Sequence, residues 1–116
     1  MFMYIIIELR LSMTAFKSDI SAIMNAQQLA VVEATMLQRG MSLYLPPPHP
    51  SQTPGQALHY EYLRETAATV RELLFRVLYE EDAGAEQRLT WELEMEGLYG
   101  VFCSARHNYE LSIMEN

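Results

Sequence analysis

The chain has 116 residues, half of them hydrophobic, with a formal net charge of −7 at pH 7 and a single cysteine. This length suits one domain with a modest core, and the apolar content argues against intrinsic disorder. We therefore expect residues 1–116 to form a single domain. A lone cysteine makes no internal disulfide, as is usual in a reducing compartment, so we expect a cytoplasmic protein.

The negative charge lies in the second half of the chain. Residues 1–58 carry three acids and three bases, whereas residues 59–116 carry twelve acids and five bases. A nucleic-acid-binding surface depends on Lys and Arg that neutralise phosphates, so this balance argues against direct binding of nucleic acid. No apolar run approaches the roughly 20 residues that span a bilayer, so we do not expect a membrane partner either.

Residues 1–12 have an ambiguous pattern. The stretch YIIIELRL alternates apolar and polar side chains after its apolar start, as a strand does, but a lone strand has nothing to pair with in a helical protein. The basic start and small-residue cleavage site of a secretory signal are both missing. We interpret residues 1–12 as an arm, a helix extension or a leader.

Residues 14–39 are predicted to form the first helix. Thr14, Ser18 and Asp19 can each cap its start, and Gly40 is typical of a helix end. One apolar stripe, spaced by three or four residues, comprises Ile20, Ile23, Ala26, Ala30, Ala34 and Leu37. Leu29, Val32 and Met36 widen the stripe, which indicates burial against two neighbours.

Residues 41–56 contain all five prolines of the chain. Because proline removes a backbone donor and fixes φ, no helix can run through LPPPHP, and the segment should be extended. We interpret it as a stiff connector between helices, in preference to a ligand for an aromatic groove. Thr53 can cap the next helix, with Pro54 in its first turn.

Residues 57–82 show the clearest amphipathic pattern, and a second apolar series after Gly84 mirrors it. If the chain folds back at Gly84, residues of the two series face one another. The facing pairs are Val77 with Trp91, Leu74 with Met95, Val70 with Leu98, Ala67 with Phe102, Leu63 with Ala105 and Tyr60 with Tyr109. This register predicts helices at residues 57–82 and 85–113 that form an antiparallel pair. Gly84 is expected in the left-handed conformation that ends a helix.

The predicted fold class is therefore all-α, a three-helix bundle built on an antiparallel αα-hairpin with a proline-rich connector. Residues 88–114 also carry a strand pattern, since Leu89, Trp91 and Leu93 alternate with polar residues and Gly97 with Gly100 can form a turn. The alternative is an α+β fold with a C-terminal β-hairpin. The mirrored register and the Glu-rich composition favour the helix.

Cys103 and His107 are the strongest candidates for chemistry, because a spacing of four places them on one helix face. Zinc normally takes four ligands, however, and no second such pair completes the set. A Cys–His nucleophile would need an orienting group and an oxyanion site, and no familiar catalytic or phosphate-binding motif occurs. We therefore expect no enzyme activity, catalytic site, metal site or cofactor.

Without catalytic motifs, aromatic and acidic side chains off the main stripe are the candidates for partner binding. We expect a non-enzymatic protein–protein interaction module, such as an adaptor or small regulator, with a protein partner of unknown identity. Apolar residues outside the main stripe, namely Leu58, Leu73 and Phe75, also predict a homodimer. The candidate partner-binding residues are Tyr60, Tyr62, Phe75, Tyr79, Glu92, Glu94 and Glu96.

The charge asymmetry supports an alternative function, an acidic inhibitor from a mobile element that blocks a basic nucleic-acid-binding site on a host protein. Carboxylates of the hairpin would then stand in for phosphates. Four nearby arginines balance much of this acidity, so the alternative ranks second. They are Arg64, Arg71, Arg76 and Arg88.

Overall fold

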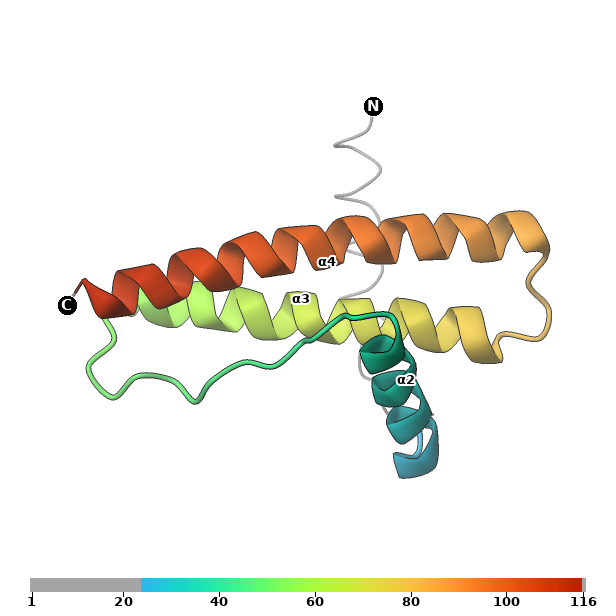
Figure 1. Ribbon diagram of the computed structural model, residues 1–116, viewed down its shortest axis with the longest axis horizontal. Helices are drawn as coiled ribbons and strands as arrows, with labels where there is room; N and C mark the ends of the chain where they lie inside the picture. Colours follow the sequence, from blue (N-terminus) through green and yellow to red (C-terminus); the bar gives the residue numbers. More distant parts are fainter. Residues whose placement is uncertain (1–23, 116) are drawn as a thin grey trace.

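A computed structural model describes residues 24–115, which form three helices (Figure 1). The helices are α2 (Ala26–Gln38), α3 (Pro54–Tyr79) and α4 (Ala85–Met114). The described chain is therefore all-α, as predicted. The alternative with a C-terminal β-hairpin is wrong, because residues 88–114 lie within one continuous helix. The interpretation of residues 1–12 and the caps proposed at residues 14–19 lie outside the described residues.

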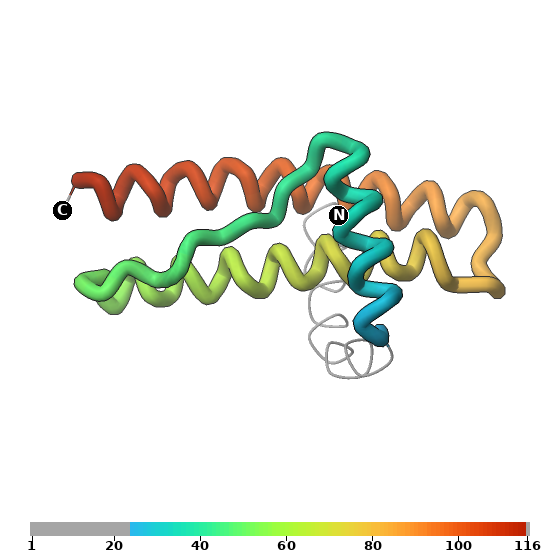
Figure 2. Tube along the Cα trace, turned by 60° about the horizontal axis from the view of Figure 1, so that its bottom comes forward, coloured from blue at the N-terminus to red at the C-terminus, as the bar shows by residue number. Residues whose placement is uncertain are grey.

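α3 and α4 lie side by side and antiparallel along the long axis of the fold (Figure 1, Figure 2). Their facing side chains form the centre of the core. Tyr60 and Tyr109 have ring centroids 5.4 Å apart, which confirms the predicted register at the open end of the hairpin. The residues of this seam that are buried are Leu63, Ala67, Val70, Leu74, Met95, Phe102 and Tyr109.

α3 begins and ends three residues earlier than predicted. Thr53 caps it as expected, because its side chain accepts a hydrogen bond from the Gln56 amide at 3.1 Å while the Gln56 side chain accepts one from the Thr53 amide at 2.8 Å. The prediction for Gly84 is wrong. Its φ is −79°, and it is the extended residue before α4, because α3 has already ended at Tyr79 and the turn reverses the chain between the two.

α2 crosses the hairpin and does not run along it (Figure 1, Figure 2). The predicted stripe is wrong for Ala26, Ala30, Ala34 and Leu37, which are exposed, whereas two of the residues expected to widen it are buried. A crossing helix touches its neighbour over a short stretch, and α2 buries only Val32 and Met36. An ion pair of 2.7 Å between Glu33 and Arg71 joins it to α3.

The two ends of α2 are defined by local hydrogen bonds. Asn25 accepts from the Gln28 amide at 2.8 Å and begins the helix at Ala26. Residues 14–23 of the predicted helix over residues 14–39 lie outside the described residues. Gly40 ends it as predicted, with a φ of +73°. The amide of Met41 then donates to the Met36 carbonyl at 2.9 Å, the bond pattern of a glycine-terminated helix.

The proline-rich connector runs along the hairpin from the end of α2 to the start of α3 (Figure 2). An extended chain outside a sheet needs other partners for its polar groups, and side chains of α3 and α4 supply them. Arg106 donates to the carbonyls of Ser42 and Tyr44 at 3.0 and 2.9 Å, and the Tyr60 hydroxyl donates to the Pro46 carbonyl at 2.6 Å. Met41 and Leu43 are buried.

Replacement of Phe102 tests the seam. Phe102 is fully buried, so Phe102→Ala should lower the free energy of unfolding by about 3–5 kcal/mol through lost burial and the cavity left behind. Leu58→Ala is the control, because Leu58 is 75% exposed and should change stability by less than about 0.5 kcal/mol. Urea denaturation followed by circular dichroism measures both. Equal effects of the two changes would contradict the seam as the main source of stability.

Candidate functional site

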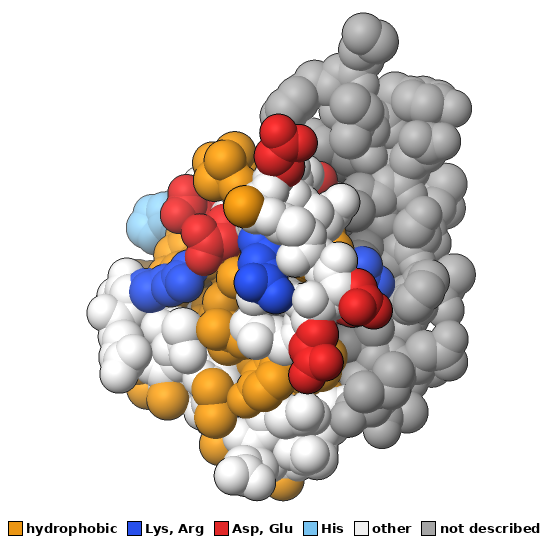
Figure 3. Space-filling view, turned by 90° about the vertical axis from the view of Figure 1, so that its right-hand side faces the viewer, with side chains coloured by type: hydrophobic (Ala, Val, Ile, Leu, Met, Phe, Trp, Pro, Cys, Tyr) orange, Lys and Arg blue, Asp and Glu red, His pale blue; other side chains and the backbone are white. Residues whose placement is uncertain are grey.

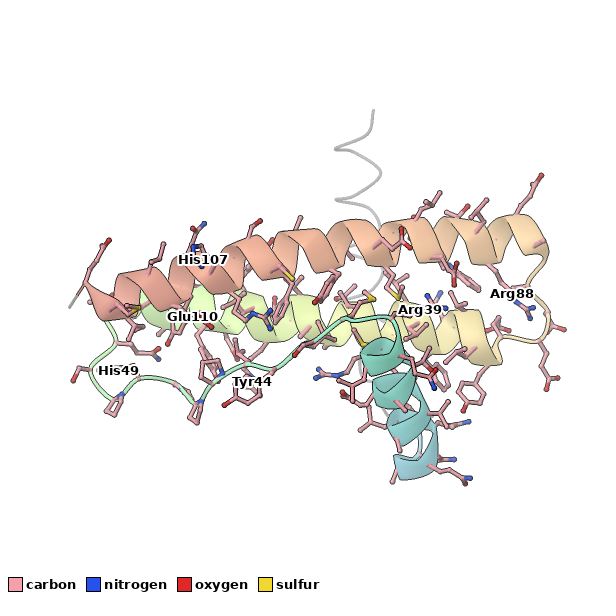
Figure 4. All side chains as sticks on the ribbon, viewed as in Figure 1. Arg39, Tyr44, His49, Arg88, His107 and Glu110 are labelled. Carbon is pink, nitrogen blue, oxygen red and sulfur yellow. The ribbon has the colours of Figure 1, made fainter. Side chains whose placement is uncertain are left out.

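The residues considered for chemistry belong to no metal-binding group of three in the described structure. Within residues 24–115, no three His, Cys, Asp or Glu side chains are placed to share a metal ion. The Cys103 sulfur lies 3.9 Å from a nitrogen of Arg106. His107 projects from the side of α4 that faces away from α3, whereas His49 lies in the connector (Figure 4). None of the described helices is both long and apolar enough to cross a membrane.

A shallow groove lies between the proline tract and the end of α4. Its volume is about 580 Å³, and Tyr109, Ile113 and Met114 face the rings of Pro46, Pro47, Pro48 and Pro50 across it. Glu110 is the one carboxylate on its lining, and His49 accepts a hydrogen bond from the Ser51 amide. The lining is mostly apolar, and the proline tract and the end of α4 form its two sides.

The predicted partner-binding aromatics fall into two groups. Tyr60 serves the fold, because its ring packs on Tyr109 and its hydroxyl holds the connector; Tyr62 is half-buried on the same helix. Phe75 and Tyr79 form a ring pair with centroids 5.2 Å apart near the end of α3. Tyr79 is 36% exposed, so within this set the Phe75–Tyr79 pair offers the more open surface.

The predicted acidic set also separates. Glu92 pairs with Arg39 at 3.0 Å and ties α4 to the end of α2. Glu94 is half-buried, and one of its oxygens is buried without a hydrogen-bond partner; this burial raises the pKa of the Glu94 carboxyl. Glu96 is exposed. The three carboxylates therefore have three different environments and do not form one acidic strip.

The three residues that motivated a homodimer differ in exposure. Leu73 is fully buried, Phe75 is partly buried against the core, and Leu58 is 75% exposed. The neighbouring Glu72 is buried as well, at 2% exposure. The flank of α3 that carries Leu73 and Glu72 is therefore covered. The homodimer stays a prediction, and Leu73 no longer supports it.

The outward side of α4 carries a surface that sequence reasoning missed. Its members follow one another at intervals of three, four or seven residues, so they share one face of the helix. They are Leu89, Leu93, Gly97, Gly100, Ser104 and Leu111, with Val101 at the edge of the face. We call this set the outer face of α4. Leu89 and Leu93 are 57% and 60% exposed, and Val101 and Leu111 are 45% and 42% exposed. The signal in the sequence was a second apolar spacing, which the alternation of Leu89, Trp91 and Leu93 concealed.

Both arginines of α4 point away from this face. Arg88 donates to the Glu80 carbonyl at 2.7 Å, in the turn between α3 and α4, and Arg106 holds the connector while its guanidinium lies 4.9 Å from the Phe102 ring centroid. Figure 4 shows Arg88 at one end of the hairpin and His107 on the outward side of α4. The exposed ionised side chains of α4 are carboxylates, including Glu86 and Glu96.

Comparison with models of known protein families, with curated protein sequences and with solved structures found no match to this chain.

The half-buried carboxyl of Glu94 leads to a prediction about pH. Its pKa is raised in the folded protein, so the folded state binds a proton more tightly than the unfolded state. Burial of the charge then destabilises the fold at pH 7, and this penalty disappears below the unfolded pKa near 4.5. Glu94→Gln should therefore raise stability at pH 7 and have little effect at pH 4. Urea denaturation at the two pH values checks this, with Glu96→Gln as the exposed control; a gain that is equal at both pH values would contradict it.

The tie between Tyr60 and the connector can be removed without loss of the ring. Tyr60→Phe deletes the hydroxyl that donates to the Pro46 carbonyl, so it should cost about 0.5–1.5 kcal/mol. It should also speed amide exchange in residues 42–52, which depend on such side-chain contacts. Tyr44→Phe is the control, because the Tyr44 side chain is 68% exposed. Unchanged exchange in the connector would show that Tyr60 does not hold it.

Proposed function

We propose that this chain is a non-enzymatic protein-interaction module, and that the outer face of α4 is its binding surface. The observation that carries the proposal is the alignment of four large exposed apolar side chains on the side of α4 opposite the core. Isolated apolar residues on a surface are ordinary, but large exposed apolar residues that line up on one side of a helix mark a candidate binding surface.

The rest of α4 supports this interpretation, because its other side is fully used. Met95, Phe102 and Tyr109 are buried against α3, and Arg106 holds the connector. A helix that were amphipathic for this fold alone would place polar residues opposite the seam. Leucines at those positions contribute nothing to the core, and their burial against a partner would be favourable.

The acidic-inhibitor alternative has less support. It requires a continuous carboxylate surface that resembles a nucleic-acid backbone, whereas Glu92 is paired with Arg39 and Glu94 is half-buried. At the turn end of the hairpin, carboxylates are interleaved with arginines and apolar side chains (Figure 3). We therefore retain the interaction module as the proposed function.

A photo-crosslinking amino acid in place of Leu93 tests this function. Irradiation of cells that make the variant should give an adduct with another protein, because the side chain at this position lies at the centre of the proposed surface. The same amino acid in place of Glu61 is the matched control, since Glu61 is also exposed and lies on α3. Mass spectrometry identifies the adducts. No adduct from position 93, or the same adducts from both positions, would contradict the proposal.

A further inference from the structure

The geometry of the outer face of α4 points to a particular kind of partner. We propose that it binds an amphipathic helix of another protein, whose apolar stripe is flanked by Lys and Arg and places a large apolar side chain over Gly97 and Gly100. This inference rests on the proposed function and adds the chemistry of the partner. Three observations carry it: the two glycines, the apolar residues on either side of them, and the direction of the charged side chains.

Gly97 and Gly100 have no role in the packing of the described fold. A Cβ added at either position would meet nothing within 4 Å, and neither residue has a positive φ. Each glycine costs a helix about 1 kcal/mol relative to alanine. A glycine on a helix surface allows the backbone of another chain to approach closely. The two glycines therefore form a notch that a second helix can fill.

Apolar side chains lie on both sides of this notch. Leu89 and Leu93 precede it and Val101 and Leu111 follow it, all exposed. The stretch from Leu89 to Leu111 is about 33 Å long at 1.5 Å per residue. A partner helix of five or six turns can lie along it, with its side chains between those of α4. A large residue over the notch would be surrounded by Leu93 and Val101, which is how a binding hot spot is built.

The charges on α4 determine which charged residues the partner helix should carry beside its apolar stripe. Glu86 and Glu96 are exposed beside the apolar residues, whereas the guanidinium groups of Arg88 and Arg106 are directed away from this face, to backbone carbonyls of the turn and the connector. The field above the outer face is therefore negative. Lys and Arg on the partner helix complement it, and complementary charges speed association and fix the register.

The same charges disfavour a second copy of this chain as the partner. Two outer faces packed together would bring Glu86 and Glu96 of one copy near those of the other, and each chain carries a net charge of −7. Like charges brought together across a helix interface are destabilising. A helix with basic flanks avoids this repulsion.

The test uses the full chain and three synthetic helical peptides of about 18 residues, which span about 27 Å of a helix. Each has the same leucine stripe with a central phenylalanine. The flanks are lysine in the first peptide, glutamine in the second and glutamate in the third. Fluorescence anisotropy should show that the lysine-flanked peptide binds at least tenfold more tightly than the glutamine-flanked one, and that the glutamate-flanked one binds least. Affinity for the lysine-flanked peptide should fall as salt is raised.

Two pairs of variants locate the binding. Gly97→Gln with Gly100→Gln fills the notch with residues that favour a helix, so it should reduce affinity for the lysine-flanked peptide at least tenfold while the thermal midpoint rises. This opposite change separates blocked docking from unfolding. Glu86→Gln with Glu96→Gln should reduce affinity about three- to tenfold, as expected for two exposed charge pairs. Glu61→Gln with Glu65→Gln removes the same charge from the exposed side of α3 and should have no effect.

Several results would overturn the inference. Equal binding of the three peptides would show that charge does not select the partner, and unchanged binding by the Gly97→Gln, Gly100→Gln variant would show that the outer face of α4 is not the docking site. A dimer in sedimentation equilibrium that this variant abolishes would identify the partner as a second copy. A crosslink from position 93 to residues 1–23 of the same chain would show that the chain covers its own face. If position 93 captures another protein but the peptides fail, the interaction function stands and only the partner chemistry is wrong.

Discussion

The packing of α3 against α4 is the interaction on which the rest of the structure depends. α2 has 13 residues, and a helix of that length is marginal in water by itself. It persists because Val32 and Met36 have an apolar surface to cover. The connector has no regular structure of its own, and its carbonyls are bound by Arg106 and Tyr60, whose positions the helix pair determines. Among residues 24–115, α2 and the connector find their packing partners in that pair.

Much of the fold could be predicted from the sequence, because the seam is local and repetitive. The facing order of Tyr60 with Tyr109 and of Ala67 with Phe102 follows from a short turn, and Thr53 and Gly40 have strong preferences for helix ends. The path of α2 could not be predicted. Its apolar residues are spread around the helix, so spacing could not distinguish Val32 and Met36, which pack, from Ala30 and Leu37, which are exposed. The angle at which two helices cross depends on the side chains of both helices. The apolar pattern of α2 alone therefore does not predict it.

The candidate site was harder to predict because α4 serves two purposes in one sequence. Its inner face has strong helical spacing, whereas its outer face is interrupted by Gly97 and Gly100, which resemble turn residues in a linear sequence. Tyr60 and Glu92 were assigned to a partner surface because their type suits one, but they are occupied by Pro46 and Arg39 within the fold. Residue type indicates what a side chain can bind, and only the fold shows what is already bound.

The extended connector affects the order in which parts of this protein unfold. Between Gln38 and Pro54 the chain makes no helix, and contacts of α2 with α3 join residues far apart in the sequence, such as Glu33 and Arg71. The hairpin contacts nearest the turn join residues closer together in the sequence, such as Arg76 and Trp91. The hairpin can therefore form first, from its turn, and α2 docks afterwards as a tethered unit. In the folded protein the reverse step, release of α2 with the hairpin intact, exposes less apolar surface than global unfolding. The molecule therefore has a graded stability, with α2 as its most weakly held described helix.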